Sequence, residues 1–196
     1  LYYSACYGEP MDFGAVARII APAEYLCSER DTIQFSGGNH ALILISLFCN
    51  SERQEAFRTA KRSLSALQGS YSAFLARHSG LHQPLFLSAT LSLDDPDPAQ
   101  DDPRTNEELL LEAYRKGSDS VLLEKMWSFG RYLLISSSRR EGLPCPLLGL
   151  WHGDYKPMWS FHMLNENLQM IYWGALSGNM PDLLLCVFDY FEKMMD

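Results

Sequence analysis

The sequence carries little positive charge and no long hydrophobic run. Its 196 residues hold 16 lysines and arginines against 24 aspartates and glutamates, a formal net charge of −8, and no segment concentrates the basic residues. A basic stripe is what attracts nucleic acid or an anionic membrane surface, so we expect neither as a partner. The longest apolar run, ALILISLF at 41–48, is far shorter than the roughly 20 residues that cross a bilayer.

The cysteines are few, odd in number and far apart: Cys6, Cys27, Cys49, Cys145 and Cys186. The sequence has no CxxC motif and no Cys/His cluster with the spacing of a zinc site. It also lacks the GxGxxG, P-loop, GxSxG and HExxH motifs. We therefore expect no cofactor and no metal, and free, mostly buried thiols rather than a disulfide framework.

What the sequence does have is hydrophobic residues, 47% of the total, which is enough to build a sizeable core. The length suits one domain or parts of two. The chain opens LYYSACYGEP, without an initiator methionine or a signal-peptide pattern, and closes DYFEKMMD with helical spacing. We expect an internal piece of a longer protein.

The first ninety residues predict strands, then two helices, then a strand. Residues 14–21 (GAVARIIA) and 40–48 (HALILISLF) are rich in β-branched and apolar side chains. Residues 51–80 repeat their apolar side chains at helical spacing and break at Gly69 and Ser70, which predicts two short helices. Residues 85–93 (LFLSATLSL) then alternate, so we expect a half-buried strand that completes the opening sheet.

An acidic, proline-rich segment, DDPDPAQDDPRT, follows and can continue neither a helix nor a central strand. We place a domain boundary there. Residues 1–94 form the first part with its two helices, 95–104 the linker, and 105–196 a helical part, which makes the chain α+β overall.

The helical part carries clear signals for helix ends. Thr105 and Glu108 have the spacing of a capping box, and Ser118 with Asp119 opens a longer helix that has a broad apolar face. Pro181 lies in the first turn of the last helix.

The stretch LNENLQMIYW places Asn165 and Asn167 just before a large apolar cluster. At this spacing two helical residues point about 200° apart, whereas two residues in extended chain share a side. If the two amides act together, they lie on the lead-in to a helix that starts near Leu168. They could then orient a water or clamp sugar hydroxyls. The same spacing also fits an asparagine helix cap with a spare neighbour, and both interpretations stay open.

Aromatic and histidine side chains surround this pair in the sequence. Trp151, Trp159 and Trp173 gather around one Gly/Pro loop and could offer flat apolar faces to sugar rings, although tryptophan also packs in cores. His152 and His162 could bind sugar hydroxyls or act as bases, with a structural hydrogen bond as the alternative.

Taken together, four stretches resemble glycoside hydrolase family 95, the α-L-fucosidase family that also contains α-L-galactosidases. They are FGRYLLISSSR (129–139), LPCPLLGLW (143–151), KPMW (156–159) and NENLQMIYW (165–173). The resemblance covers much of the chain and is closest over 129–173. The chain departs from the family pattern by carrying apolar residues at four usually polar positions: Pro146, Leu148, Ile171 and Leu176.

The resemblance implies an N-terminal β-sandwich, a helical linker and an (α/α)₆ barrel, of which this chain holds the end of the sandwich, the linker and the first barrel helices. It implies removal of terminal α-L-fucose or α-L-galactose from a glycan with inversion of configuration. Asn165 and Asn167 then activate the water together with an aspartate, and a glutamic acid later in the barrel is the general acid. The sugar-binding candidates are Trp151, His152, Trp159, His162 and Trp173.

Two other functions remain open. One is a non-catalytic carbohydrate-binding or scaffold protein on the same architecture. The other is a related α/α-barrel hydrolase or phosphorylase that acts on another sugar, which phosphate-dependent cleavage would reveal.

Overall fold

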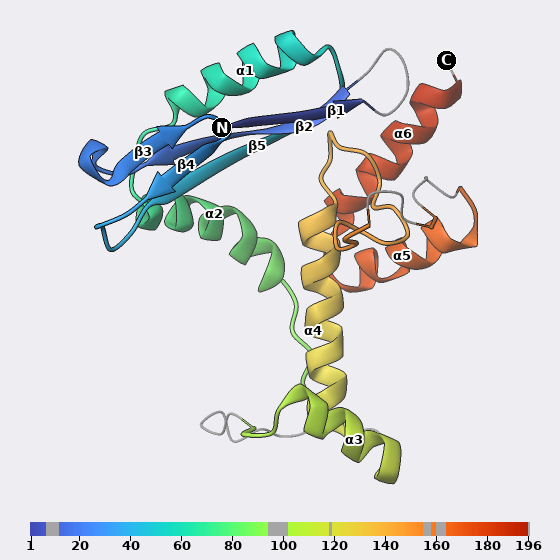
Figure 1. Ribbon diagram of the computed structural model, residues 1–196. Helices are drawn as coiled ribbons and strands as arrows, with labels where there is room; N and C mark the ends of the chain where they lie inside the picture. Colours follow the sequence, from blue (N-terminus) through green and yellow to red (C-terminus); the bar gives the residue numbers. More distant parts are fainter. Residues whose placement is uncertain (7–11, 94–101, 118, 155–157, 160–163, 196) are drawn as a thin grey trace. The chain divides into compact units, whose positions relative to one another are not determined.

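The computed structural model (Figure 1) describes residues 1–6, 12–93, 102–117, 119–154, 158–159 and 164–195. It contains both strands and helices, so the chain is α+β. It divides into two compact units, Leu1–Arg77 and His78–Asp196, and helix α2 (Tyr71–Phe86) runs from the first into the second. The predicted linker at 95–104 lies mostly outside the described residues, and the domain assignment stays a prediction.

The first unit is built on an antiparallel sheet in the order β1-β2-β5, formed by β1 (Tyr2–Cys6), β2 (Asp12–Ile20) and β5 (Leu42–Ser51). The strands predicted at 14–21 and 40–48 are confirmed as β2 and β5. A short 3₁₀ turn, η1 (Ala23–Tyr25), leads into a separate hairpin of β3 (Leu26–Glu29) and β4 (Thr32–Phe35).

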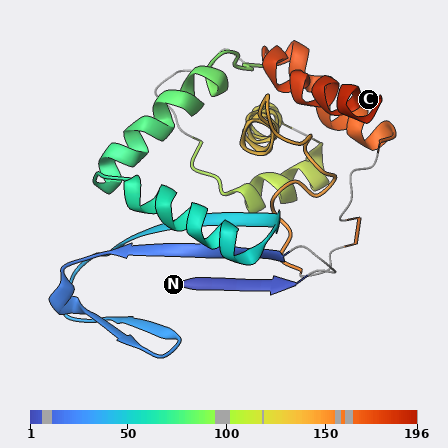
Figure 2. The ribbon, with the colours of Figure 1, turned by 90° about the horizontal axis from the view of Figure 1, so that it is seen from above.

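Helix α1 (Arg53–Ala66) runs along the three-stranded sheet (Figure 2) and buries Ala60 and Leu64 against Val16 of β2. The Glu52 carboxylate caps the helix by accepting two backbone N–H groups, which lowers the pKa of Glu52. Arg18 Nη1 donates to carbonyl oxygens at the other end of α1, including that of Leu64 at 2.7 Å. The two helices predicted over residues 51–80, with a break at Gly69 and Ser70, are confirmed as α1 and α2.

The strand predicted at 85–93 is wrong. Helix α2 continues through Pro84, in its last turn, to Phe86, and no regular structure follows up to residue 93. The segment's polar groups find partners on the helical unit: Ser88 exchanges two hydrogen bonds with Asn179 at 3.1 Å. The backbone N–H of Leu93 donates to the carboxylate of Glu124 at 2.7 Å. These hydrogen bonds give partners to backbone groups that would have paired within the sheet in the predicted strand.

The second unit contains α3 (Asn106–Lys116), α4 (Ser120–Ser137), α5 (Glu166–Ser177), the 3₁₀ turn η2 (Pro181–Leu184) and α6 (Leu185–Met195). The predicted caps are confirmed: Thr105 and Glu108 form a capping box, and Asp119 caps α4. Pro181, predicted in the first turn of the last helix, instead opens the 3₁₀ turn η2, and α6 begins at Leu185. Ser118 lies outside the described residues. The core is formed by α4, α5, η2, α6 and two residues outside the helices, Cys145 and Met180; its buried members are Leu134, Cys145, Leu168, Tyr172, Ala175, Met180, Leu183 and Cys186.

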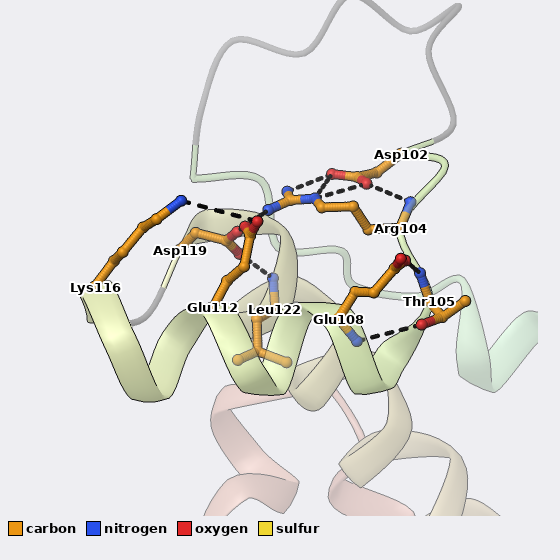
Figure 3. A network of polar contacts seen from close by, with 8 residues as sticks. All are labelled: Asp102, Arg104, Thr105, Glu108, Glu112, Lys116, Asp119 and Leu122. Carbon is orange, nitrogen blue, oxygen red and sulfur yellow. Dashed lines mark hydrogen bonds and ion pairs between the residues drawn. The ribbon is translucent and has the colours of Figure 1, made fainter.

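A cluster of charges joins the start of α3 to the start of α4 (Figure 3). Arg104 donates to the carboxylates of Asp102, Glu112 and Asp119, the last two at 2.7 Å. The hydrogen bonds from Arg104 lower the pKa of Asp102 to about 2. The Asp119 carboxylate also accepts the backbone N–H of Leu122, which is the main reason that its pKa is lowered. Arg104 therefore holds the residue that caps α4.

The four cysteines whose side chains the structure describes are free, as predicted, but only two of them are buried. Cys145 and Cys186 lie in the helical core, whereas Cys27 and Cys49 are exposed on strands. The side chain of Cys6 lies outside the described set. Cys49 lies on β5, where successive side chains point to opposite faces of the sheet. Cys27 lies in the β3–β4 hairpin, whose residues are all exposed or half-buried.

Candidate active site

The candidate pair of asparagines lies at the N-terminus of α5. Asn165 has extended backbone angles and is the N-cap: its Oδ1 accepts the backbone N–H of Asn167 at 3.0 Å. Its carbonyl oxygen accepts the N–H of Leu168, also at 3.0 Å. The helix therefore starts at Glu166, and the predicted start near Leu168 is wrong. A side-chain oxygen at the N-cap supplies a partner for a backbone donor that would otherwise have none, so α5 begins earlier.

Capping leaves the amides able to do more. Each asparagine has one oxygen with two lone pairs and two N–H donors, and the cap contact occupies one lone pair of Asn165. Asn165 is exposed and Asn167 is half-buried. Both lie at the positive end of the helix dipole, which favours an oxygen that carries partial negative charge. Each amide can therefore orient a water or a sugar hydroxyl, but neither can take up a proton. Asn167 lies in the first turn of α5, so the extended lead-in on which both side chains would share a side is not formed.

A groove of about 350 Å³ runs between α5 and α6 and begins at Asn165. Trp173 lines the same groove and is two-thirds exposed, so these two predicted site residues share one surface. The remaining lining is mostly apolar: Leu164, Leu168, Gln169, Tyr172, Leu176, Leu184, Val187, Phe188 and Phe191.

Trp151 and His152 lie elsewhere, on the loop that follows α4. A turn closed by the Gly149 N–H and the Pro146 carbonyl, 2.8 Å apart, precedes them. Gly149 adopts φ +59, which favours glycine. The Trp151 ring is half-exposed, with its centroid 6.5 Å from that of Tyr132, and it borders a second cavity of about 250 Å³ between α4 and the loop. His152 is exposed.

Trp159 is half-exposed and has a positive φ of +64, an uncommon backbone conformation for a bulky residue. His162, the remaining predicted site residue, lies outside the described residues. The structure thus groups Asn165, Asn167 and Trp173 at α5 and groups Trp151 with His152 on the preceding loop.

Two buried polar residues, Tyr172 and Arg131, form hydrogen bonds between the elements that carry the candidate site. Neither role was predicted from the sequence. The hydroxyl of Tyr172, on α5, contacts Ser138 at 2.7 Å and the backbone N–H of Cys145 at 2.8 Å. Burial raises the pKa of Tyr172, so its hydroxyl keeps its proton, and burial likewise raises the pKa of the Cys145 thiol. In the sequence, Tyr172 is one more aromatic in an apolar run, which gives no signal of a polar role.

Arg131 is the second of these buried polar residues. It is 4% exposed within α4, and its guanidinium donates to the Gly178 carbonyl after α5 and to the Leu85 carbonyl at 2.7 Å. It also lies over the ring of Trp127, 4.8 Å from the centroid. Arg131 joins the end of α2 to α4 and α5. An arginine inside an otherwise apolar helical stretch is the one sequence signal that could have found it.

The described residues contain no group of three or more His, Cys, Asp and Glu side chains that could hold a metal ion. Within those same ranges, no helix has both the length and the apolar character needed to cross a membrane.

The helical unit has a polar helix end, exposed tryptophans and an apolar groove, which are features of a carbohydrate-active protein. Residues 70–196 match the glycosyl hydrolase family 95 catalytic domain. The chain belongs to this family.

Curated relatives agree. Over 138 residues the chain is 36% identical to a probable alpha-fucosidase A of Aspergillus niger. This alignment covers 69% of the chain and 17% of that protein. Over 149 residues the chain is 35% identical to alpha-L-fucosidase 2 of Arabidopsis thaliana, and this alignment covers 74% of the chain and 17% of that protein. A probable alpha-fucosidase A of Aspergillus oryzae is 35% identical over 138 residues. The chain thus spans about a sixth of the length of these relatives.

Proposed function

We propose that this chain is part of a glycosidase that removes terminal α-L-fucose or α-L-galactose from glycans with inversion of configuration. The observation that carries the proposal is that the family match covers residues 70–196 and so includes every candidate site residue. The named relatives are α-fucosidases, and each is aligned to more than two thirds of the chain.

Asn165 and Asn167 orient the attacking water in this proposal. The 3.0 Å contact between the Asn165 oxygen and the Asn167 N–H fixes the first amide on the helix end, and the second lies in the first turn. Because amides do not titrate, the two asparagines only orient the water; a carboxylate must accept the water's proton, and a second carboxylic acid must protonate the leaving oxygen. In inverting glycosidases the two carboxyl groups lie about 6.5–9.5 Å apart, which leaves room for that water.

Trp173 shares the α5–α6 groove with Asn165 and offers an apolar face to a sugar ring next to the water site. Trp151 and Trp159 offer further faces, and His152 and His162 contact sugar hydroxyls. The fold assignment belongs to the same proposal: residues 1–94 contribute the end of a β-sandwich and two linker helices, and 105–196 contribute the first helices of an (α/α)₆ barrel.

The test is made on the full-length protein with aryl α-L-fucoside and aryl α-L-galactoside as substrates. Asn165→Ala and Asn167→Ala should each lower kcat about 10²–10³-fold, the loss typical of one oriented polar group in the transition state. The matched control is Asn165→Ser. Serine caps a helix about as well as asparagine, so the melting temperature of the Asn165→Ser variant should stay near that of wild type while its kcat falls.

A purely structural role predicts the opposite pattern for Asn165→Ala: about 1 kcal/mol less stability with kcat nearly intact. Full kcat in both Asn165→Ser and Asn167→Ala would rule out water activation by the pair. NMR of the first-formed product should show the β anomer. A sugar phosphate formed only in the presence of inorganic phosphate would instead identify a phosphorylase.

A further inference from the structure

One hydroxyl in the apolar core of the helical unit joins four segments. The Tyr172 side chain, 5% exposed, comes from α5. Its oxygen lies 2.7 Å from Oγ of Ser138, which ends α4, and 2.8 Å from the backbone nitrogen of Cys145 on the following loop. It also lies 3.3 Å from Sγ of Cys186 on α6.

The Cys145 N–H can only donate, so the Tyr172 hydroxyl accepts from it. In the contacts of Tyr172 with Ser138 Oγ and Cys186 Sγ either atom can be the donor, and the Cys186 thiol also lies 3.1 Å from the Leu183 carbonyl. A phenol has one donor and two acceptor positions, so its capacity is fully used.

The loop is anchored where Tyr172 meets it. Pro144 is fully buried and Cys145 is 7% exposed, whereas Trp151, six residues further along, is 49% exposed. Between them lies the turn closed by the Gly149 N–H. Beyond Cys145, Trp151 contacts Tyr132 of α4, so the anchor at Cys145 is the contact that sets this loop relative to α5.

The same tyrosine also fixes the other half of the candidate site. Leu168, four residues before Tyr172, is buried on the same side of α5, and Asn165 lies one turn earlier still. Seven residues of helix separate Asn165 from Tyr172, a rise of about 10 Å. A rigid helix segment thus connects the hydroxyl that holds the loop to the amide at the helix end.

We propose that Tyr172 is a positioning residue: its hydroxyl holds the loop that carries Trp151 in register with the α5 end that carries Asn165. This inference rests on the proposed glycosidase function, because register matters only if both groups act on one substrate. Tyr172 itself lies in the core and acts through these two residues.

The experiment compares full-length wild type with Tyr172→Phe, which keeps the ring and removes the three contacts. Two controls match it. Tyr114→Phe makes the same chemical change at a side chain that is 92% exposed. Thr105→Ala removes a helix cap beyond the far end of α4, and the 18 residues of α4 place it about 27 Å from the cluster.

In Tyr172→Phe, kcat should fall about 10- to 100-fold at a temperature well below both melting points, because displacement of a positioned group by about 1 Å can cost that much. KM should change less than about threefold, since Trp151 is still present. Amides of 139–151 should exchange hydrogen faster. Both controls should keep wild-type kcat and wild-type exchange in this loop. Ser138→Ala, which removes one of the three contacts, should give a smaller loss.

An active wild type with unchanged kcat in Tyr172→Phe overturns the inference and leaves the proposed function standing. Unchanged loop exchange in Tyr172→Phe also overturns it, whatever the activity. A wild type that cleaves neither glycoside defeats the proposed function instead, and the exchange comparison still decides whether Tyr172 anchors the loop.

Discussion

Replacing Arg131 by alanine should destabilise the helical unit by about 3–5 kcal/mol, because three carbonyl oxygens lose a charged donor and each such loss costs about 1–3 kcal/mol. The guanidinium donates to the carbonyl oxygens of Gly178, Leu85 (2.7 Å) and Phe86 (3.1 Å). It also stacks on Trp127. Alanine would leave three carbonyls without this donor and open a cavity between α2, α4 and the turn after α5.

The magnitude follows from opposing contributions. A hydrogen bond to a charged group contributes about 1.5–3 kcal/mol, and a desolvated cation–π contact about 2 kcal/mol. Their sum is an upper bound, because burial of the charge opposes it: desolvation lowers the pKa of Arg131. A net loss of about 3–5 kcal/mol remains once that cost is included.

The assay is urea unfolding followed by circular dichroism at pH 7. Arg131→Lys should fall between wild type and alanine, because one ammonium cannot reach Gly178 and the end of α2 together. The control is Arg58→Ala, which removes an exposed i,i+3 ion pair and should change stability by less than about 0.5 kcal/mol. If Arg131→Ala fails to fold, Arg131→Lys supplies the measurement. A loss below about 1 kcal/mol in Arg131→Ala would refute the reasoning.

Two further predictions concern the start of the helical unit. Thr105→Ala should lower the free energy of unfolding by about 1 kcal/mol in urea titrations, because the capping box with Glu108 is lost, and Thr105→Ser should restore most of it. The Asp102 pKa lies near 2, below its usual 3.8, so its carboxylate stabilises the folded state above about pH 4 and that contribution disappears as the pH falls toward 2. Asp102→Asn should flatten the fall in melting temperature over this window, and a variant that still follows the wild-type curve would contradict the assignment.

The elements that could be predicted are those fixed by neighbouring residues. The apolar, β-branched runs at 14–21 and 40–48 form β2 and β5 because each buries one face under α1. The capping box at Thr105 formed because both of its partners lie within one turn. Such signals need no knowledge of the rest of the fold.

The strand predicted at 85–93 failed for a non-local reason. Alternation describes a side-chain pattern, but the backbone groups of Leu85 and Phe86 belong to a helix end whose carbonyls Arg131 holds from 45 residues away. Ser88 is tied to Asn179, 91 residues later. Local pattern cannot reveal partners at that distance, and the same limit hid the role of Tyr172.

At Asn165, the local sequence accounts for the helix cap but does not by itself account for the proposed catalytic role. Its oxygen caps α5, and for that purpose asparagine, aspartate and serine are nearly equivalent. Stability of the helix end therefore does not require an amide there. The amide differs from the other two in its donors: it has two N–H donors beside its acceptor oxygen, whereas serine has one O–H donor on a shorter side chain and an ionised aspartate has none. Two donors and an acceptor that do not titrate suit a group that must orient a neutral water and the carboxylate behind it. The cap and the proposed chemistry are compatible, since the cap uses one lone pair and fixes the remaining polar groups of Asn165 at the helix end that borders the α5–α6 groove. Serine at this position retains the cap but lacks the two N–H donors, so the kcat of Asn165→Ser measures what the amide adds.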